Sequence, residues 1–188
     1  MKKISTLFKK DPNDLGRVIG EINLENEWVF NDKGVIATRK YDGTACAIIE
    51  GRLYRRYDVK KGREIPEGAI PCQEADPISG HHPHWVLCSR DNKADVYHFE
   101  AFDKYSEWMD GTYELCGEKI QGNPEKFIGH ELILHGVDDL DLTPDCHNFE
   151  SFKNILTNLN IEGIVFHHTD GRMCKLRKSD YGIKRQNQ

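Results

Sequence analysis

The stretch that decides the fold is residues 34–60, which read GVIATRKYDGTACAIIEGRLYRRYDVK. Two segments, Gly34–Ala37 and Thr44–Ile49, have the apolar and β-branched content of strands, and a turn sequence separates them. A second turn then leads into a third strand, Leu53–Val59. We therefore expect Lys40 where a strand ends, next to an antiparallel hairpin.

The rest of the chain continues this pattern of short strands with a few helices. Apolar residues spaced by three or four predict a helix in Asp95–Trp108 and a second helix that Asn148 caps and that ends near Asn160. Further strands are expected at Thr112–Cys116, Glu131–His135, Ile164–Phe166 and Met173–Arg177. The fold class is therefore α+β, rich in antiparallel sheet, without a parallel βαβ array.

The charge distribution excludes a protein that coats nucleic acid non-specifically. The 188 residues contain 26 Lys and Arg against 31 Asp and Glu, a net charge of −5. Two segments are nevertheless cationic, Arg52–Glu64 with six cations against two anions and Arg172–Gln188 with six against one. Such local concentrations suit the binding of phosphate groups at defined places.

Length and composition favour one intracellular domain. A chain of 188 residues forms one sizeable core, so we expect a single domain over 1–188. No apolar run approaches the roughly 18 residues of a membrane helix, and six scattered cysteines suit a reducing compartment. We expect a cytoplasmic or otherwise intracellular protein with no membrane association and no obligate protein partner. Its cysteines and histidines lack the spacing of a structural zinc site.

Four short motifs follow one another along the chain. They are TRKYDGT at 38–44, YELCGEKIQGNP at 113–124, IEGIVF at 161–166 and KLRK at 175–178. This ordered set resembles motifs I, III, IV and V of the covalent nucleotidyltransferases, which include ATP-dependent DNA and RNA ligases and mRNA capping guanylyltransferases. The run 112–124 and the ending KLRKSDYG at 175–182 are most similar to those of RNA ligases.

The resemblance implies catalytic roles for Lys40, Lys175 and Arg177. Lys40 stands at the position of the nucleophile that attacks the α-phosphate of ATP and becomes lysyl-AMP. A lysine amine attacks only in its neutral form, which neighbouring cations and burial favour. Lys175 and Arg177 would supply that field and stabilise the charge that develops on the phosphate oxygens. Lys178 is expected on the opposite strand face, either exposed to solvent or functional.

The same resemblance implies a nucleotide and metal site. Glu114 corresponds to a ribose contact and Glu162 to a metal contact, and both are candidate ligands for Mg²⁺ or Mn²⁺. The expected ATP-binding set is completed by Asp42, Gly43 and Arg56, with Lys40 and Lys175.

The basic hairpin is the expected place for RNA. Arg55, Arg56 and Lys60 are candidate contacts to an RNA 5′-phosphate, and Arg56 is favoured for the site because it shares a strand face with Lys60. A solvated surface hairpin is the alternative interpretation. Residues 76–85, DPISGHHPHW, are also similar to a loop of small RNA ligase-like proteins, in which Trp85 or a histidine could stack on a base.

The resemblance thus implies an ATP-dependent RNA ligase that joins RNA 5′-phosphate and 3′-hydroxyl ends, built as an ATP-grasp-like ligase adenylation domain. Ala45 stands where DNA ligases have an arginine, which argues against that branch. We expect no OB-fold or accessory domain after motif V. Two alternatives stay open: a GTP-dependent capping-type guanylyltransferase and a non-catalytic nucleotide-binding module.

Overall fold

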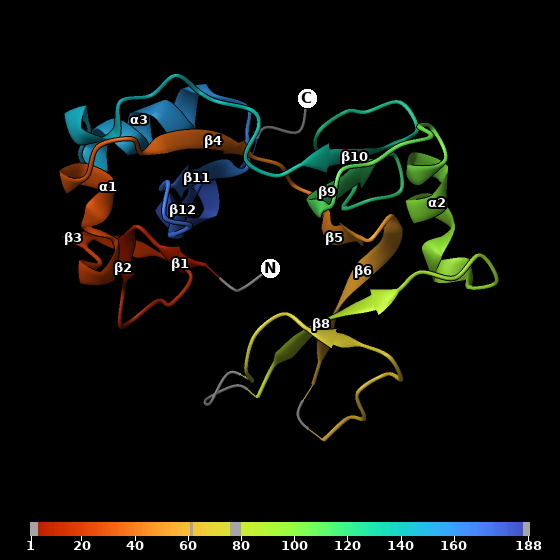
Figure 1. Cartoon of the computed structure of the whole chain (residues 1–188). Helices are drawn as coiled ribbons and strands as arrows, with labels where there is room; N and C mark the ends of the chain where they lie inside the picture. Colours follow the sequence, from red (N-terminus) through yellow and green to blue (C-terminus); the bar gives the residue numbers. More distant parts are fainter. Residues whose placement is uncertain (1–3, 61, 76–79, 186–188) are drawn as a thin grey trace. The chain divides into compact units, whose positions relative to one another are not determined.

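The computed structural model describes residues 4–60, 62–75 and 80–185, which fold into sheets and a few short helices (Figure 1). The chain forms two compact units, one of Asp42–His135 and one of Ile4–Tyr41 with Gly136–Gln188. All strand pairs but one are antiparallel among the described residues. The predicted α+β class, rich in antiparallel sheet, is therefore confirmed.

The unit of Ile4–Tyr41 and Gly136–Gln188 contains a four-stranded sheet and a separate two-stranded one. The larger sheet has the order β1 (Ser5–Thr6), β12 (Met173–Arg177), β11 (Gly163–His167) and β4 (Ile36–Lys40). Only β1 and β12 are parallel. The smaller sheet pairs β2 (Phe8–Lys10) with β3 (Val18–Ile22), and short helical turns follow at η1 (Leu24–Asn26), α1 (Trp28–Asn31) and η3 (Pro144–Cys146).

Helix α3 (Phe149–Asn158) covers one face of the four-stranded sheet (Figure 1). Its fully buried Phe152 and Leu156 belong to the same core as Phe166 on β11. The predicted cap is confirmed, because the Asn148 side chain accepts a hydrogen bond from the Ser151 N–H at 3.0 Å, and the Ser151 hydroxyl accepts one from the Asn148 N–H at 2.7 Å. This reciprocal box fixes where the helix begins.

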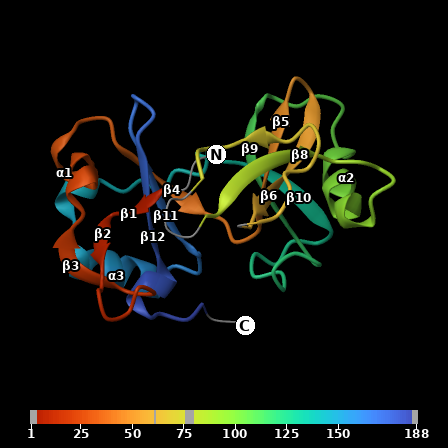
Figure 2. The same ribbon diagram turned by 90° about the horizontal axis from the view of Figure 1, so that it is seen from below.

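The unit of Asp42–His135 is built on one six-stranded antiparallel sheet. Its order is β10 (His130–Leu134), β9 (Gly111–Gly117), β5 (Thr44–Ile49), β6 (Arg52–Val59), β8 (His82–Leu87) and β7 (Ile70–Pro71). Helix α2 (Val96–Phe102), preceded by η2 (Lys93–Asp95), packs against β10 and β6 (Figure 2). The side chains of the six strands therefore divide into a helix-covered face and an opposite face.

Three sequence expectations need correction. The first strand of the motif I region is Ile36–Lys40 and not Gly34–Ala37, although it does end at Lys40 as predicted. The helix expected over Asp95–Trp108 ends at Phe102, because the Trp108 ring folds back to stack on Phe102 and its Nε1 donates to the Phe102 carbonyl at 3.0 Å.

The region predicted as a base-stacking loop is also different. His82–Leu87 forms strand β8, and Trp85 is only 5% exposed in a cluster with Tyr54 and Ala47. Residues 76–79 of that stretch lie outside the described residues. Burial in a strand therefore removes Trp85 from the candidates for stacking on a base.

The cysteines behave as expected of a protein without disulfides. All six are free thiols, and Cys46, Cys88, Cys116 and Cys174 are buried. Across the described part of the chain, no helix combines the length and the apolar character that a membrane crossing needs.

Candidate active site

The register of three strands places the predicted catalytic cations on one sheet face. Lys40 on β4 and Arg177 on β12 both pair with Gly163 on β11. Two positions further along, Lys175 on β12 pairs with Val165. Because side chains alternate along a strand, these cations point to the same side. Apart from the half-buried Arg39, the alternate positions are fully buried core residues: Ala37, Ile164, Phe166, Cys174 and Leu176.

Gly163 leaves the space between the side chains of Lys40 and Arg177 free. A Cβ atom at this position would collide with the carbonyl oxygen of Leu176 on the neighbouring strand. Only glycine fits, so no side chain stands between the two cations.

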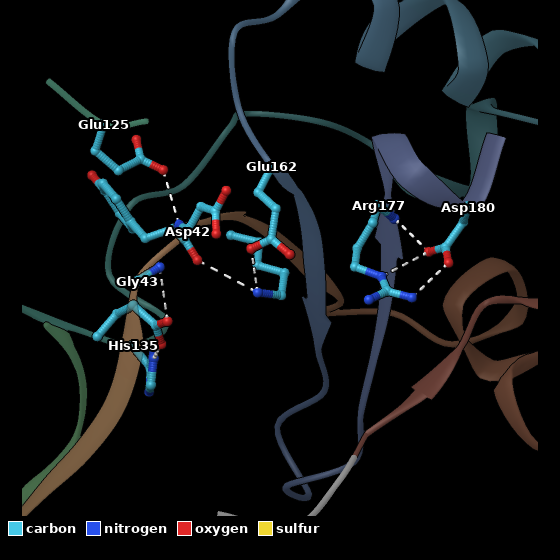
Figure 3. A network of polar contacts seen from close by, with 10 residues as sticks. Asp42, Gly43, Glu125, His135, Glu162, Arg177 and Asp180 are labelled. Atoms are coloured by element: carbon cyan, nitrogen blue, oxygen red, sulfur yellow. Dashed lines mark hydrogen bonds and ion pairs between the residues drawn. The ribbon is translucent and has the colours of Figure 1, made fainter. Parts of the chain in front are cut away.

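Glu162 immediately precedes β11 and contacts the predicted nucleophile. Its carboxylate accepts a hydrogen bond from Lys40 Nζ, which also lies 3.4 Å from the Tyr41 carbonyl oxygen. The two side chains are each 23% exposed. The structure therefore brings the predicted nucleophile and the predicted metal ligand into direct contact within one unit (Figure 3).

Lys175 lies in a strongly cationic environment. Burial, together with the neighbouring charges of Arg177 and Lys40, lowers its pKa from 10.5 to about 8, although Asp180 and Glu162 partly oppose the shift. The positive charge of Lys175 therefore lowers the stability of the folded protein. An anion bound near it would relieve that cost.

Asp180 holds Arg177 in a fixed orientation (Figure 3). Its carboxylate, which is fully buried, accepts hydrogen bonds from Arg177 Nη2 at 2.9 Å, from the Arg177 N–H at 2.8 Å and from Lys10 Nζ at 2.7 Å. Burial alone would raise the pKa of Asp180, but the bonds from Arg177 and Lys10 hold it below the ordinary value. Asp180 was not predicted from the sequence, although its position three residues after Arg177 could have indicated a partner for that arginine.

Lys178 does not continue the strand. It begins the 3-10 turn η4 (Lys178–Tyr181) and is only 5% exposed. The interpretation of Lys178 as a solvent-exposed strand lysine is therefore wrong. Burial, with a smaller contribution from Arg185, lowers its pKa.

The unit of Asp42–His135 holds a second group of predicted residues, because the boundary between the units falls between Tyr41 and Asp42. Glu114 Oε1 accepts a hydrogen bond from the Gly43 N–H at 3.1 Å. A Cβ atom on Gly43 would collide with the Leu115 carbonyl, so glycine is required for this close approach. The Asp42 N–H donates to Glu125 Oε1 at 2.9 Å (Figure 3).

His135 orients Glu114 and was not predicted from the sequence. Its Nε2 lies 3.0 Å from Glu114 Oε2, and its Nδ1 lies 3.0 Å from the Thr112 hydroxyl. The contact arises because His135 lies two positions from Ile133, the strand partner of Glu114. Glu114 is 8% exposed, and these contacts fix the position of its carboxylate.

The two arginines of the basic hairpin occupy opposite sheet faces. Arg55 lies on the helix-covered face, where its Nε forms an ion pair with the buried Asp95 at 2.9 Å. Arg56 lies on the other face with Tyr54, and its Nε is 3.3 Å from Asp58. Lys60 follows the end of β6 and is exposed. The two arginine side chains are about equally exposed, but the partner of Arg55 is buried and the partner of Arg56 is exposed.

The predicted metal ligands have the donor chemistry that magnesium requires. Mg²⁺ binds through one or two carboxylates and substrate phosphates and keeps several waters. Glu162 lies within one unit beside the cations that would face a triphosphate. Glu114 has both carboxylate oxygens engaged, by Gly43 and His135. Glu162 is the predicted metal ligand that lies in the same unit as the predicted nucleophile.

Comparison with known proteins finds similarity to RNA ligases. Residues 103–188 match the family model described as RNA ligase 1. This match includes the motifs with Glu114, Glu162, Lys175 and Arg177. It supports an RNA ligase family for the chain, with which the covalent nucleotidyltransferase superfamily is consistent.

Individual relatives agree with this family. The chain is 28% identical to RNA ligase 1 of Pongo abelii over 164 residues, which cover 64% of this chain and 49% of the relative. It is 24% identical to RNA ligase 1 of Rattus norvegicus over 219 residues, which cover 79% of this chain and 67% of the relative. The chain thus spans about half of the first relative. The resemblance to RNA ligases predicted from the motifs is borne out.

Proposed function

We propose that this chain is an ATP-dependent RNA ligase that works through a lysyl-AMP intermediate. The observation that carries the proposal is the placement of Lys40, Lys175 and Arg177 on one face of β4, β11 and β12, with Glu162 in contact with Lys40. Relatives named RNA ligase 1 support the reaction class. The proposal includes the fold type, a nucleotidyltransferase domain with ATP-grasp-like adenylation architecture.

Lys40 is the proposed nucleophile of the first step. Its neutral Nζ attacks the α-phosphate of ATP, a P–N bond forms, and the bond to the β-phosphate breaks to release pyrophosphate. The amine loses a proton in the process. Arg177 and Lys175 lie on the same sheet face as this amine.

Lys175 and Arg177 are the proposed donors to the reacting phosphate. Negative charge develops on the phosphate oxygens in the transition state, and fixed donors stabilise it without reorganisation. Asp180 fixes the Arg177 guanidinium, so this donor is already oriented before the nucleotide binds. Lys175 is two residues away on the same strand face.

The remaining predicted residues have proposed roles with the nucleotide. Glu162 would hold Mg²⁺ or Mn²⁺, which supplies positive charge to the phosphates when bound. Glu114 would accept a hydrogen bond from the ribose, and Gly43 and Asp42 would approach the nucleotide through their backbone. Arg56 is the proposed phosphate contact on the face of β6 opposite Arg55.

The later steps require RNA with a 5′-phosphate and a 3′-hydroxyl. AMP passes from Lys40 to the 5′-phosphate, and the 3′-hydroxyl then attacks the activated phosphate and releases AMP. Arg56 and Lys60 are the proposed contacts to the RNA, because they are the predicted hairpin cations that are not held by a buried partner.

The test is covalent labelling with α-labelled ATP and magnesium, with Lys40→Ala compared with Lys33→Ala. Lys33 is an exposed lysine close to β4 and serves as the matched control. We expect the label on the wild-type chain and on Lys33→Ala, and none on Lys40→Ala. A labelled Lys40→Ala chain would contradict the nucleophile assignment.

The same assay distinguishes the other two functions. Labelling by α-labelled GTP in preference to ATP would indicate a capping-type guanylyltransferase. Binding of ATP without any covalent label would indicate a nucleotide-binding module. Sealing of a strand with 5′-phosphate and 3′-hydroxyl ends completes the test, since adenylylation without sealing would refute the ligase assignment.

A further inference from the structure

A buried cluster of Cys88, Asp95 and His98 lies on the helix-covered face of the six-stranded sheet. Cys88 follows β8, Asp95 ends η2, and His98 is in the first turn of α2. Their exposures are 7%, 0% and 7%, and one potential ligand atom of each lies within 4.8 Å of the others. The three residues belong to one unit and are separate from the residues assigned to ATP and RNA.

Two members of this cluster have polar atoms without a hydrogen-bond partner. Neither ring nitrogen of His98 has a partner, and Asp95 Oδ1 accepts no hydrogen bond although Arg55 Nε lies 2.9 Å away. Most buried side-chain polar atoms are hydrogen-bonded, and those that are not require a reason. Burial lowers the pKa of His98, so its ring is neutral and has a lone pair to offer.

The other oxygen of Asp95 is firmly held. Asp95 Oδ2 accepts hydrogen bonds from the Ser89 N–H at 3.0 Å and from Asn92 Nδ2 at 3.1 Å. Contacts of this kind orient ligating carboxylates in metal sites. Oδ1 has lone-pair capacity left beside its contact with Arg55.

The Cys88 thiol supplies the third ligand type. Burial, with a contribution from Asp95, raises its pKa to about 12, so the metal-free chain holds a thiol here and not a thiolate. Binding of a divalent ion would release that single proton and leave a thiolate. The two anionic ligands would then balance the charge of the ion, with Arg55 as an additional cation.

We propose that Cys88, Asp95 and His98 bind one zinc ion that fixes α2 and η2 to the end of strand β8. Thiolate, imidazole and carboxylate together are ligands that zinc accepts, whereas magnesium and calcium select oxygen ligands. This site cannot be recognised from the sequence, because the spacing of seven and three residues matches no common zinc pattern. The turn through Ser89–Asn92 brings the ligands together.

The first test is the metal content of the full chain, purified without metal-affinity steps, dialysed against zinc and then against buffer. We expect about one zinc ion per chain in the wild type. The control is Cys146→Ser, which changes an exposed cysteine and should keep its zinc. The variants Cys88→Ala and His98→Ala should lose most of it. A wild-type chain without bound zinc would overturn the proposal, whether or not the variants fold.

Cobalt substitution gives a second reading that does not depend on activity. Co²⁺ bound by a cysteine thiolate has a charge-transfer absorption in the near ultraviolet. The wild type and Cys146→Ser should display this absorption and Cys88→Ala should not. The same band in Cys88→Ala would refute the assignment of the thiolate. A chain that is labelled by ATP but binds no zinc would reject this proposal and leave the ligase proposal intact.

Discussion

Replacing Lys175 with methionine should make the protein more stable and inactive at the same time. Burial, Arg177 and Lys40 lower the pKa of Lys175 from 10.5 to about 8. One pKa unit corresponds to about 1.36 kcal/mol, so the buried charge costs about 2 to 3 kcal/mol at neutral pH after allowance for partial solvation. Methionine keeps an unbranched chain and removes the charge. It should raise the free energy of unfolding by that amount and abolish adenylylation.

The predicted stabilisation depends on pH in a defined direction. Below pH 8 Lys175 is protonated in both the folded and the unfolded chain, so the cost is fully present. Between pH 8 and 10.5 the folded chain releases this proton first, so the unfolded state binds more protons and the wild type gains stability as pH rises. The advantage of Lys175→Met should therefore be largest at pH 7 and nearly gone at pH 10.5.

The measurement is urea unfolding of the wild type and Lys175→Met at several pH values from 7 to 10.5. Lys153→Met on the exposed side of α3 is the matched control and should change stability little at any pH. Each variant is compared with the wild type at the same pH, so the contributions of groups that titrate in both proteins cancel. A stability difference that does not vary with pH, or a destabilised Lys175→Met, would refute the reasoning.

Four other substitutions follow from the site geometry. His135→Ala should raise the ATP concentration needed for half-maximal adenylylation about tenfold, because Glu114 loses a charge-assisted hydrogen bond; an unchanged ATP dependence would contradict this. Arg56→Ala should slow sealing of RNA and reduce its salt dependence without changing stability. Arg55→Ala should instead lower the unfolding free energy by about 3 kcal/mol, because it leaves a buried carboxylate unpaired. Equal effects of the two substitutions in unfolding and sealing assays would argue against separate roles. Asp180→Asn should lower the unfolding free energy by about 2 kcal/mol and slow adenylylation, as measured by urea titration and single-turnover labelling; wild-type values in both would remove Asp180 from the site.

The parts of the fold that local patterns determine could be predicted from the sequence. The end of β4 at Lys40, the cap at Asn148 and the antiparallel return of Met173–Arg177 all depend on residues close together in the chain. The helix boundary at Phe102 could not be predicted, because the stacking of Trp108 that accompanies it is a tertiary contact.

The same distinction applies to the candidate site. Strand alternation correctly separated Arg55 from Arg56, but the ion pair of Arg55 with Asp95 joins residues forty positions apart. His135 likewise reaches Glu114 from a different strand, over twenty-one positions. Such partners come from sheet topology, and one sequence contains no local signal for them.

The register of β11 with β4 and β12 determines both the packing of the core and the alignment of the predicted catalytic cations. A slip of one residue would turn Lys40 toward the core and Ile164 toward the opposite face, so a misaligned chain would lose both its packing and its alignment of cations. Under the proposed function, the moles of AMP bound per mole of chain therefore count the correctly paired molecules in a preparation. Adenylylation could then serve as a titration of properly folded protein, independent of any spectroscopic standard.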